Sequence, residues 1–152
     1  MLKADLDPVQ FTAEARAALA DAQAALEHLL ALPTDASFQV VIAAFDAIGR
    51  PLDRVRGPAG LAGQVHPDEV LRNAANVVVQ ELAAFGTDLS IHRGVYERLA
   101  RLDPTQSSGE LERRLHAHAL RDFRRSGVDR DDATRARIRS LSDELVKVGQ
   151  EF

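Results

Sequence analysis

The apolar residues of this 152-residue chain recur at intervals of three and four along nearly its whole length. The stretch "SFQVVIAAFDAI" is typical, because its large apolar side chains fall on one face of an α-helix. No run of β-branched residues alternates with polar ones over a useful length, so no segment competes as a strand. The sequence therefore predicts an all-α fold.

Capping residues and prolines divide the first half of the chain into three helices. The first is expected to begin at Asp7-Pro8 or at Thr12 and to end at Pro33. The second is expected to begin after Ser37, a good N-cap. The third follows Pro67, since proline is well tolerated in the first turn of a helix.

Two further helices are predicted in the second half. A capping-box spacing, Ser107-x-x-Glu110, starts the fourth helix, and Gly127 is placed to end it in a left-handed conformation. Asp129 or Asp131 then starts the fifth. Apolar residues of the fifth helix alternate steps of three and four, as in the seam of a helical pair: Ile138, Leu141, Leu145, Val148 and Phe152. We expect a bundle of about five helices with a long antiparallel hairpin at the C-terminal end.

The whole chain, residues 1–152, is expected to form one helical domain. Glycines and prolines concentrate near residues 49–67, which predicts a kink or a short break in the second helix and a mobile loop. Apolar stretches are interrupted well before the roughly 20 residues that a bilayer requires, so we expect no membrane partner. The apolar seam runs to Phe152 without a C-cap, which predicts that the chain is a fragment. Such a fragment should expose an apolar patch and self-associate through it.

Composition narrows the choice of function. The chain has no cysteine and a net charge of -4, which excludes disulfides, thiol nucleophiles and thiolate metal sites and gives no overall attraction to nucleic acid. A cytoplasmic protein is the expectation that fits best. The chain contains no G-x-S-x-G elbow and no P-loop, and the glycines of "GPAGLAG" follow a helix rather than a strand.

The five histidines do not suggest a metal site. His116 and His118 are two residues apart, which places them about 200° apart around a helix, whereas chelation from one helix needs a spacing of three or four. His28, His66 and His92 belong to different helical segments. We therefore assign no catalytic, cofactor-binding or metal-binding residue, and no cofactor, to this chain.

The one cluster of basic residues in the sequence consists of arginines, and acidic residues are interspersed among them. The arginines are Arg113, Arg114, Arg121, Arg124, Arg125, Arg130, Arg135, Arg137 and Arg139. No aromatic residues alternate with them to stack bases, so a salt-bridged helix surface is favoured over a weak nucleic-acid binder. The paired carboxylates Asp131-Asp132 and Asp143-Glu144 are interpreted as structural, because they suit helix starts and solvated faces.

Three stretches resemble one known family in order and spacing. "ALRDFRRSGVDRDDATRARIRSLSDELVKVGQEF" is similar to a segment in the N-terminal half of the thimet oligopeptidase and oligopeptidase A family, where an "RDFRRSG"-like turn precedes a long "R-x-L-S-x-E-L-x-K-L-x-x-x-F" helix. "SFQVVIAAFDAI" resembles the family's "T-F-E-N-T-I-x-A-L-D" region. "VHPDEVLRNAANVVVQELAAFGTDLSIHRGVYERLARL" resembles its "S-V-H-P-x-x-x-L-R-x-A" helix and "Y-x-x-L" continuation. The match runs from about residue 37 to residue 152, although residues 49–64 are richer in glycine and proline than the long helix of the family.

This resemblance implies a role for a parent enzyme. Members of the family are mostly helical zinc metallopeptidases that cleave short peptides inside a deep channel, and their N-terminal helices form one wall of it. Their zinc ligands lie on an H-E-x-x-H helix, which this chain lacks. The resemblance therefore implies a non-catalytic fragment that partners with a catalytic half and short peptides. A stand-alone helical interaction module is the alternative, and an arginine-rich nucleic-acid binder is the third hypothesis.

Overall fold

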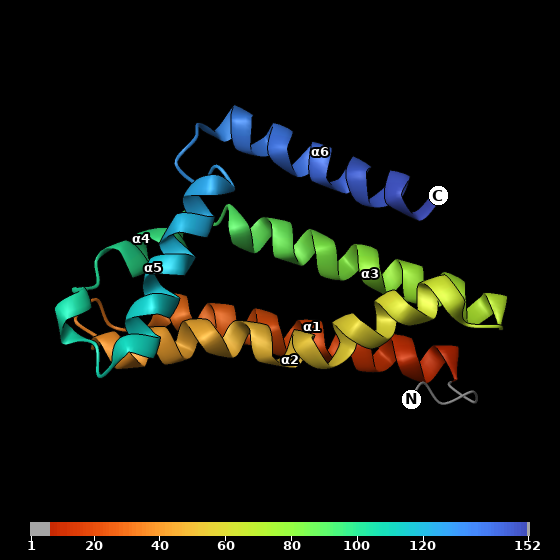
Figure 1. The fold of residues 1–152 in the computed structure, drawn as a ribbon, viewed down its shortest axis with the longest axis horizontal. Coiled ribbons are helices and arrows are strands. Elements are labelled where there is room, and N and C mark those ends of the chain that lie inside the picture. The colour runs from red at the N-terminus through yellow and green to blue at the C-terminus, as the bar shows by residue number, and fades with distance from the viewer. Residues whose placement is uncertain (1–6, 152) are drawn as a thin grey trace.

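The computed structural model describes residues 7–151, which form six α-helices, one 3-10 helix and no strand. The all-α prediction is confirmed. Three long helices, α1 (Pro8–Ala31), α2 (Phe38–Val65) and α3 (Glu69–Ser90), lie side by side (Figure 1) and pack against one another. They form the layer on which the rest of the molecule is built.

The remaining elements gather at one end of this layer and then return along it. Helix α4 (Arg93–Ala100), the 3-10 helix η1 (Pro104–Gln106) and α5 (Glu110–Arg125) lie together where α1 ends and α2 begins (Figure 1). Helix α6 (Asp132–Glu151) then runs beside α3. Within residues 7–151, no helix combines the length and the apolar character that crossing a bilayer requires.

The break and the loop predicted near residues 49–67 are wrong, because α2 continues to Val65, whereas the alternative prediction of a kink agrees with the bend in α2. Pro51 and Pro58 both lie inside the helix. A proline removes one backbone hydrogen bond and pushes against the preceding turn, which bends a helix when packing holds both sides in place. Ile48 and Leu52 are buried on either side of Pro51. Figure 1 shows the outcome, a change of direction in the second half of α2.

Buried side chains form two clusters along the layer. One lies between α1, α2 and α3 and includes Ala15 and Ala22, whose small side chains let the helices approach closely. The other lies at the end covered by α4 and α5 and is centred on Phe38, Leu29 and Leu99. Covering this second cluster gives α4 and α5 their place, because both helices are amphipathic and direct their apolar residues into it.

The predicted starts of α1 and α2 are confirmed by capping hydrogen bonds, whereas α3 begins after the N-cap Asp68, so Pro67 lies outside its first turn. Asp7 accepts a bond from the Val9 amide at 3.1 Å, and Ser37 accepts one from the Val40 amide at 3.4 Å. Each side chain satisfies an amide that has no partner within its helix. These local signals fixed the starts of α1 and α2 independently of tertiary packing.

The capping box predicted for α5 is shifted along the chain. Gly109, rather than Ser107, is the N-cap residue and offers no side-chain bond. The backbone amide of Ser108 instead donates to Oε2 of Glu112 at 2.8 Å. The expected Ser107 and Glu110 pair is therefore wrong, although a glutamate in the first turn still supplies the reciprocal bond.

Gly127 ends α5 in the left-handed conformation that the sequence predicts, with φ of 85°. The Val128 amide donates to the Phe123 carbonyl at 3.1 Å and the Gly127 amide donates to the Arg124 carbonyl at 3.1 Å. These two bonds satisfy carbonyls at the end of α5. The chain can then reverse and start α6 within a few residues.

The antiparallel partner of α6 is α3, not α5, so the hairpin expected between the last two helices does not form. Gln150 donates to the Asn76 carbonyl at 2.9 Å near the end of α6, and Arg139 pairs with Asp88 nearer its start. The numbering rises along α6 as it falls along α3, which defines the antiparallel direction. Helix α5 is not free to pair, because its apolar residues already cover the cluster at α2 and α4.

Gly127 provides a test of the joint between α5 and α6. A Cβ atom at this position would lie 2.7 Å from Cδ1 of Ile138, in a conformation that L residues rarely adopt. We expect Gly127→Ala to lower the free energy of unfolding by about 1–2 kcal/mol or more in urea titrations. The matched control is Gly49→Ala, within α2 and with nothing near its would-be Cβ. This control should stabilise the protein by about 0.5–1 kcal/mol, and equal effects of the two substitutions would contradict the described joint.

Candidate functional site

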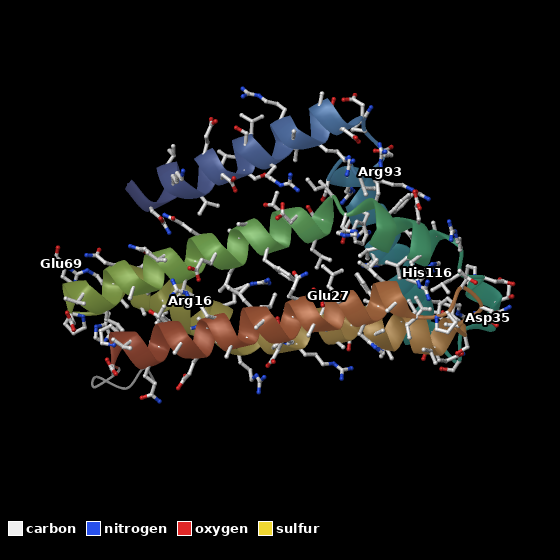
Figure 2. The ribbon with its side chains drawn as sticks, turned by 180° about the vertical axis from the view of Figure 1, so that it is seen from behind. Arg16, Glu27, Asp35, Glu69, Arg93 and His116 are labelled. Carbon is white, nitrogen blue, oxygen red and sulfur yellow. The ribbon has the colours of Figure 1, made fainter. Side chains whose placement is uncertain are left out.

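His116 is buried and serves the core. Its Nε2 lies 2.8 Å from the Leu99 carbonyl, and its ring packs edge-on against Phe38 at a centroid distance of 5.3 Å. Because a carbonyl oxygen only accepts, Nε2 carries the proton and donates it. Figure 2 shows His116 at the end of the molecule that α4 and α5 cover. Both ring contacts anchor α5 to α4 and α2.

Two other histidines cap helices. Nδ1 of His92 accepts a bond from the Val95 amide at 3.3 Å at the start of α4. Nδ1 of buried His66 accepts a bond from the Asp68 amide at 3.2 Å between α2 and α3. His28 and His118 are exposed on α1 and α5. In the part of the chain that the structure describes, no three histidine or carboxylate side chains could together hold a metal ion. These residues do not fit a zinc site.

The arginine cluster is largely engaged with carboxylates and other polar groups of this chain. Arg113 pairs with Glu110 at 3.2 Å, and Arg124 donates to the Tyr96 hydroxyl at 3.0 Å while lying over its ring. The segment "GPAGLAG" lies within α2, so its glycines form no loop that could surround a phosphate. The cluster thus has the geometry of a salt-bridged surface, in which exposed pairs contribute little stability individually.

A denser set of charged contacts fixes the start of α6. Arg93 of α4 donates to the carbonyls of Val128 and Arg130 and lies 3.6 Å from Asp132. Figure 2 shows Arg93 beside this joint. Arg135 pairs with Asp132 at 2.6 Å. The hydrogen bond from Arg135, aided by the charges of Arg135 and Arg93, lowers the pKa of Asp132. These contacts direct α6 back along α3.

Three further ionisable groups have shifted pKa values with simple causes. The hydrogen bond from the Thr134 amide, joined by one from its hydroxyl, lowers the pKa of Asp131. Thr105 lowers the pKa of Asp103 in the same way at η1. The pKa of Arg16 on α1 is raised by its hydrogen bond to Glu81 on α3. All three shifts belong to caps or ion pairs, so none marks a catalytic group.

An apolar hollow of about 310 Å³ opens between α2, α3 and α5. Large apolar side chains line most of it, and α5 also contributes the polar side chains of His118 and Asp122. The lining includes Phe45, Leu89, Leu115, Phe123, His118 and Asp122. Sequence reasoning missed this hollow, because its walls come from three helices that are distant along the chain. It is an apolar concavity that a ligand or partner side chain could fill.

The apolar seam predicted on α6 faces outward. Leu141, Leu145 and Val148 are 40%, 72% and 48% exposed. No residue from 132 to 150 is buried, and Ile138 is half-buried. The seam is therefore not the contact with α3, and the expected pairing through it is wrong. Phe152, the last residue of that pattern, lies outside the described residues.

Comparison with known proteins gives relatives of one kind. The chain is 32% identical over 157 residues to the mitochondrial intermediate peptidase of Mycosarcoma maydis. The aligned region covers 95% of this chain and 18% of that protein. The chain is 30% identical over 150 residues to the mitochondrial intermediate peptidase of Pleurotus djamor, covering 95% of this chain and 19% of the relative. It is 31% identical over 126 residues to the mitochondrial intermediate peptidase 2 of Cryptococcus neoformans, and this match covers 79% of this chain and 15% of that protein. No family model matches the chain.

These relatives correct one expectation. Each is named as a mitochondrial protein, so the cytoplasmic location predicted from composition is wrong. The expectation rested largely on the lack of cysteine, and a chain without cysteine forms no disulfide in any compartment. Its composition could not distinguish the two locations. The chain also spans less than a fifth of the length of these relatives.

His116 provides a test of the core that supports α5. We expect His116→Ala to lower the free energy of unfolding by about 2 kcal/mol or more, because both a buried hydrogen bond and aromatic packing are lost. His118→Ala, on the exposed side of the same helix, should change it by no more than about 0.5 kcal/mol. Urea unfolding followed by circular dichroism measures both. Similar losses for the two variants would contradict the described orientation of α5.

Acidification should loosen the first turn of α6. The pKa of Asp131 in the folded protein lies below its ordinary value of 3.8, so its charged form stabilises the fold. This contribution is complete well above 3.8 and is lost as the pH falls through the lowered pKa. Amide hydrogen exchange at Thr134, measured relative to the intrinsic exchange rate at each pH, should accelerate in that window. Asp131→Asn, which keeps an N-cap acceptor that does not titrate, should reduce the acceleration, and an unchanged acid response would overturn this assignment.

Proposed function

Because the chain belongs to the thimet oligopeptidase family, we propose that it is the non-catalytic helical region of a zinc-dependent oligopeptidase. The observation that carries this proposal is identity of about 30% to peptidases that are more than five times as long, over up to 95% of this chain. The catalytic H-E-x-x-H pattern is absent from the 152 residues. The chemistry would therefore come from the remainder of the enzyme.

The structural roles of the histidines support the proposal that the catalytic groups lie in the remainder of the enzyme and not in this chain. His116 holds α5, and His66 and His92 cap helices, so each of these three has a structural hydrogen bond. Zinc in the complete enzyme would supply an activated water for attack on a peptide carbonyl. This chain would contribute position and shape instead, by holding a stable surface beside the substrate.

The dimensions of the helices suit a wall of a peptide channel. Helix α2 has 28 residues and α1 has 24, which at 1.5 Å per residue gives about 36–42 Å. An extended peptide of about a dozen residues has a similar length. A layer of three such helices would line one side of a channel for short peptides, while its rigidity would keep folded proteins out.

A chimeric enzyme tests the proposal. In it, the segment of the Mycosarcoma maydis peptidase that matches this chain is replaced by residues 1–152, and a second protein lacks the segment. We expect the chimera to cleave a quenched short peptide in a zinc-dependent manner, with a loss of no more than about a hundredfold caused by imperfect joining. The protein lacking the segment and the isolated chain should show no cleavage above background.

Two results would count against the proposal. A chimera as inactive as the protein without the segment would show that this chain cannot replace the corresponding region. Zinc-dependent cleavage by the isolated chain, removed by a chelator, would show that it carries a catalytic site of its own. Mixing the isolated chain with the protein that lacks the segment is the control for poor joining. It distinguishes inactivity caused by a missing region from inactivity caused by the junctions of the chimera.

A further inference from the structure

The attachment of α6 to the rest of the molecule is mainly polar. Arg135 donates to the Ile91 carbonyl at 3.2 Å, Arg139 pairs with Asp88, and Gln150 bonds both the Asn76 carbonyl and the Gln80 side chain. Directional bonds at both ends of a helix fix its rotation about its axis. These contacts turn Leu141, Leu145 and Val148 away from α3, whereas Val146 is half-buried and lines a hollow with Ala83 and Ala84 of α3.

These apolar residues form a continuous stripe, called here the α6 apolar face: Leu141, Leu145 and Val148. Spacings of four and three place them on one side of the helix. Ile138 precedes them with the same spacing and lies against Gly127 at the end of α5. The stripe thus begins at the joint with α5 and continues along α6 beyond the reach of α5 (Figure 1).

The apolar hollow reaches the joint at which this stripe begins, because Ser126, the neighbour of Gly127 in the chain, is part of its lining. Figure 1 shows α5 running across the end of α3 beside which α6 begins, so α5 makes an angle with the α3 and α6 pair. Phe123 and Leu115 of α5 and Leu89 of α3 line the hollow at this crossing. The exposed apolar side chains of α6 thus lie along one side of the angle between α5 and α6. The apolar hollow lies at the vertex of this angle.

We propose that a helix from the remainder of the enzyme packs along the α6 apolar face and places a bulky apolar side chain in the hollow. This inference rests on the proposed function, because the relatives contain more than five times the length of this chain. Steps of three and four are the spacing at which one helix packs against another. The docked helix would carry an apolar stripe of the same kind.

The area of the stripe favours a segment of the same polypeptide over a second copy. Three side chains are small beside the roughly 1,200–2,000 Å² that a stable interface between separate proteins buries. A covalently linked segment needs less area, because linkage supplies a high effective concentration. The stripe is thus suited to an intramolecular contact.

Thiol labelling tests the proposal directly, since the chain has no cysteine of its own. Leu145→Cys places a thiol in the stripe, and Leu111→Cys places one on α5 where Leu111 is 82% exposed. Maleimide labelling is followed at each position by mass spectrometry, both in the isolated chain and in the chimera. We expect both variants to react rapidly in the isolated chain. In the chimera, Leu145→Cys should react at least about tenfold more slowly, with Leu111→Cys within about twofold of its original rate.

Other outcomes overturn the inference. Equal slowing at the two positions, or none at Leu145→Cys, shows that no segment covers the stripe specifically. Slow labelling of Leu145→Cys in the isolated chain that recovers on dilution identifies a second copy as the occupant. Peptide cleavage by the chimera is read separately: an active chimera with rapid labelling contradicts the inference alone, and an inactive chimera with protected Leu145→Cys contradicts the proposed function alone.

Discussion

Helix α3 connects the α1 and α2 pair to α6, because it packs on two sides with different chemistry. Its buried residues, Leu71, Val78 and Leu82 among them, face α1 and α2, and burying each such side chain is worth about 1.5–3 kcal/mol. Its other side holds α6 through Asn76, Gln80 and Asp88. The apolar contact supplies most of the stability, while the polar contact supplies the direction and rotation of α6.

This difference supports the proposal that the chain is one part of a larger fold. A last helix attached by apolar residues would bury its stripe and complete the core. Polar attachment instead leaves Leu141, Leu145 and Val148 exposed in a row, next to a hollow lined by Phe45 and Phe123. Exposed apolar surface of this kind commonly marks a contact with another segment or protein. The same arrangement agrees with relatives that are several times longer than this chain.

Local chemistry made much of the fold predictable, whereas long-range packing decided what was not. Asp7, Ser37 and Gly127 act within a few residues, so their roles followed from the sequence. Burial around Pro51 kept α2 continuous, and no local pattern reports burial. The partner and rotation of α6 depend on bonds between residues about 50–74 positions apart, such as Arg139 to Asp88 and Gln150 to Asn76. For the site, the salt-bridged role of the arginines was the more predictable part, and the hollow could not be predicted.

Hydrogen exchange along α6 is the most direct test of the claim that this chain is one part of a larger enzyme. In the isolated chain, α6 amides should exchange faster than those of α1, because no residue from 132 to 150 is buried. In the chimera, α6 should slow by an order of magnitude or more while α1 stays nearly unchanged. Identical exchange of α6 in the two proteins would contradict the account, since the helix would then be complete without any further segment.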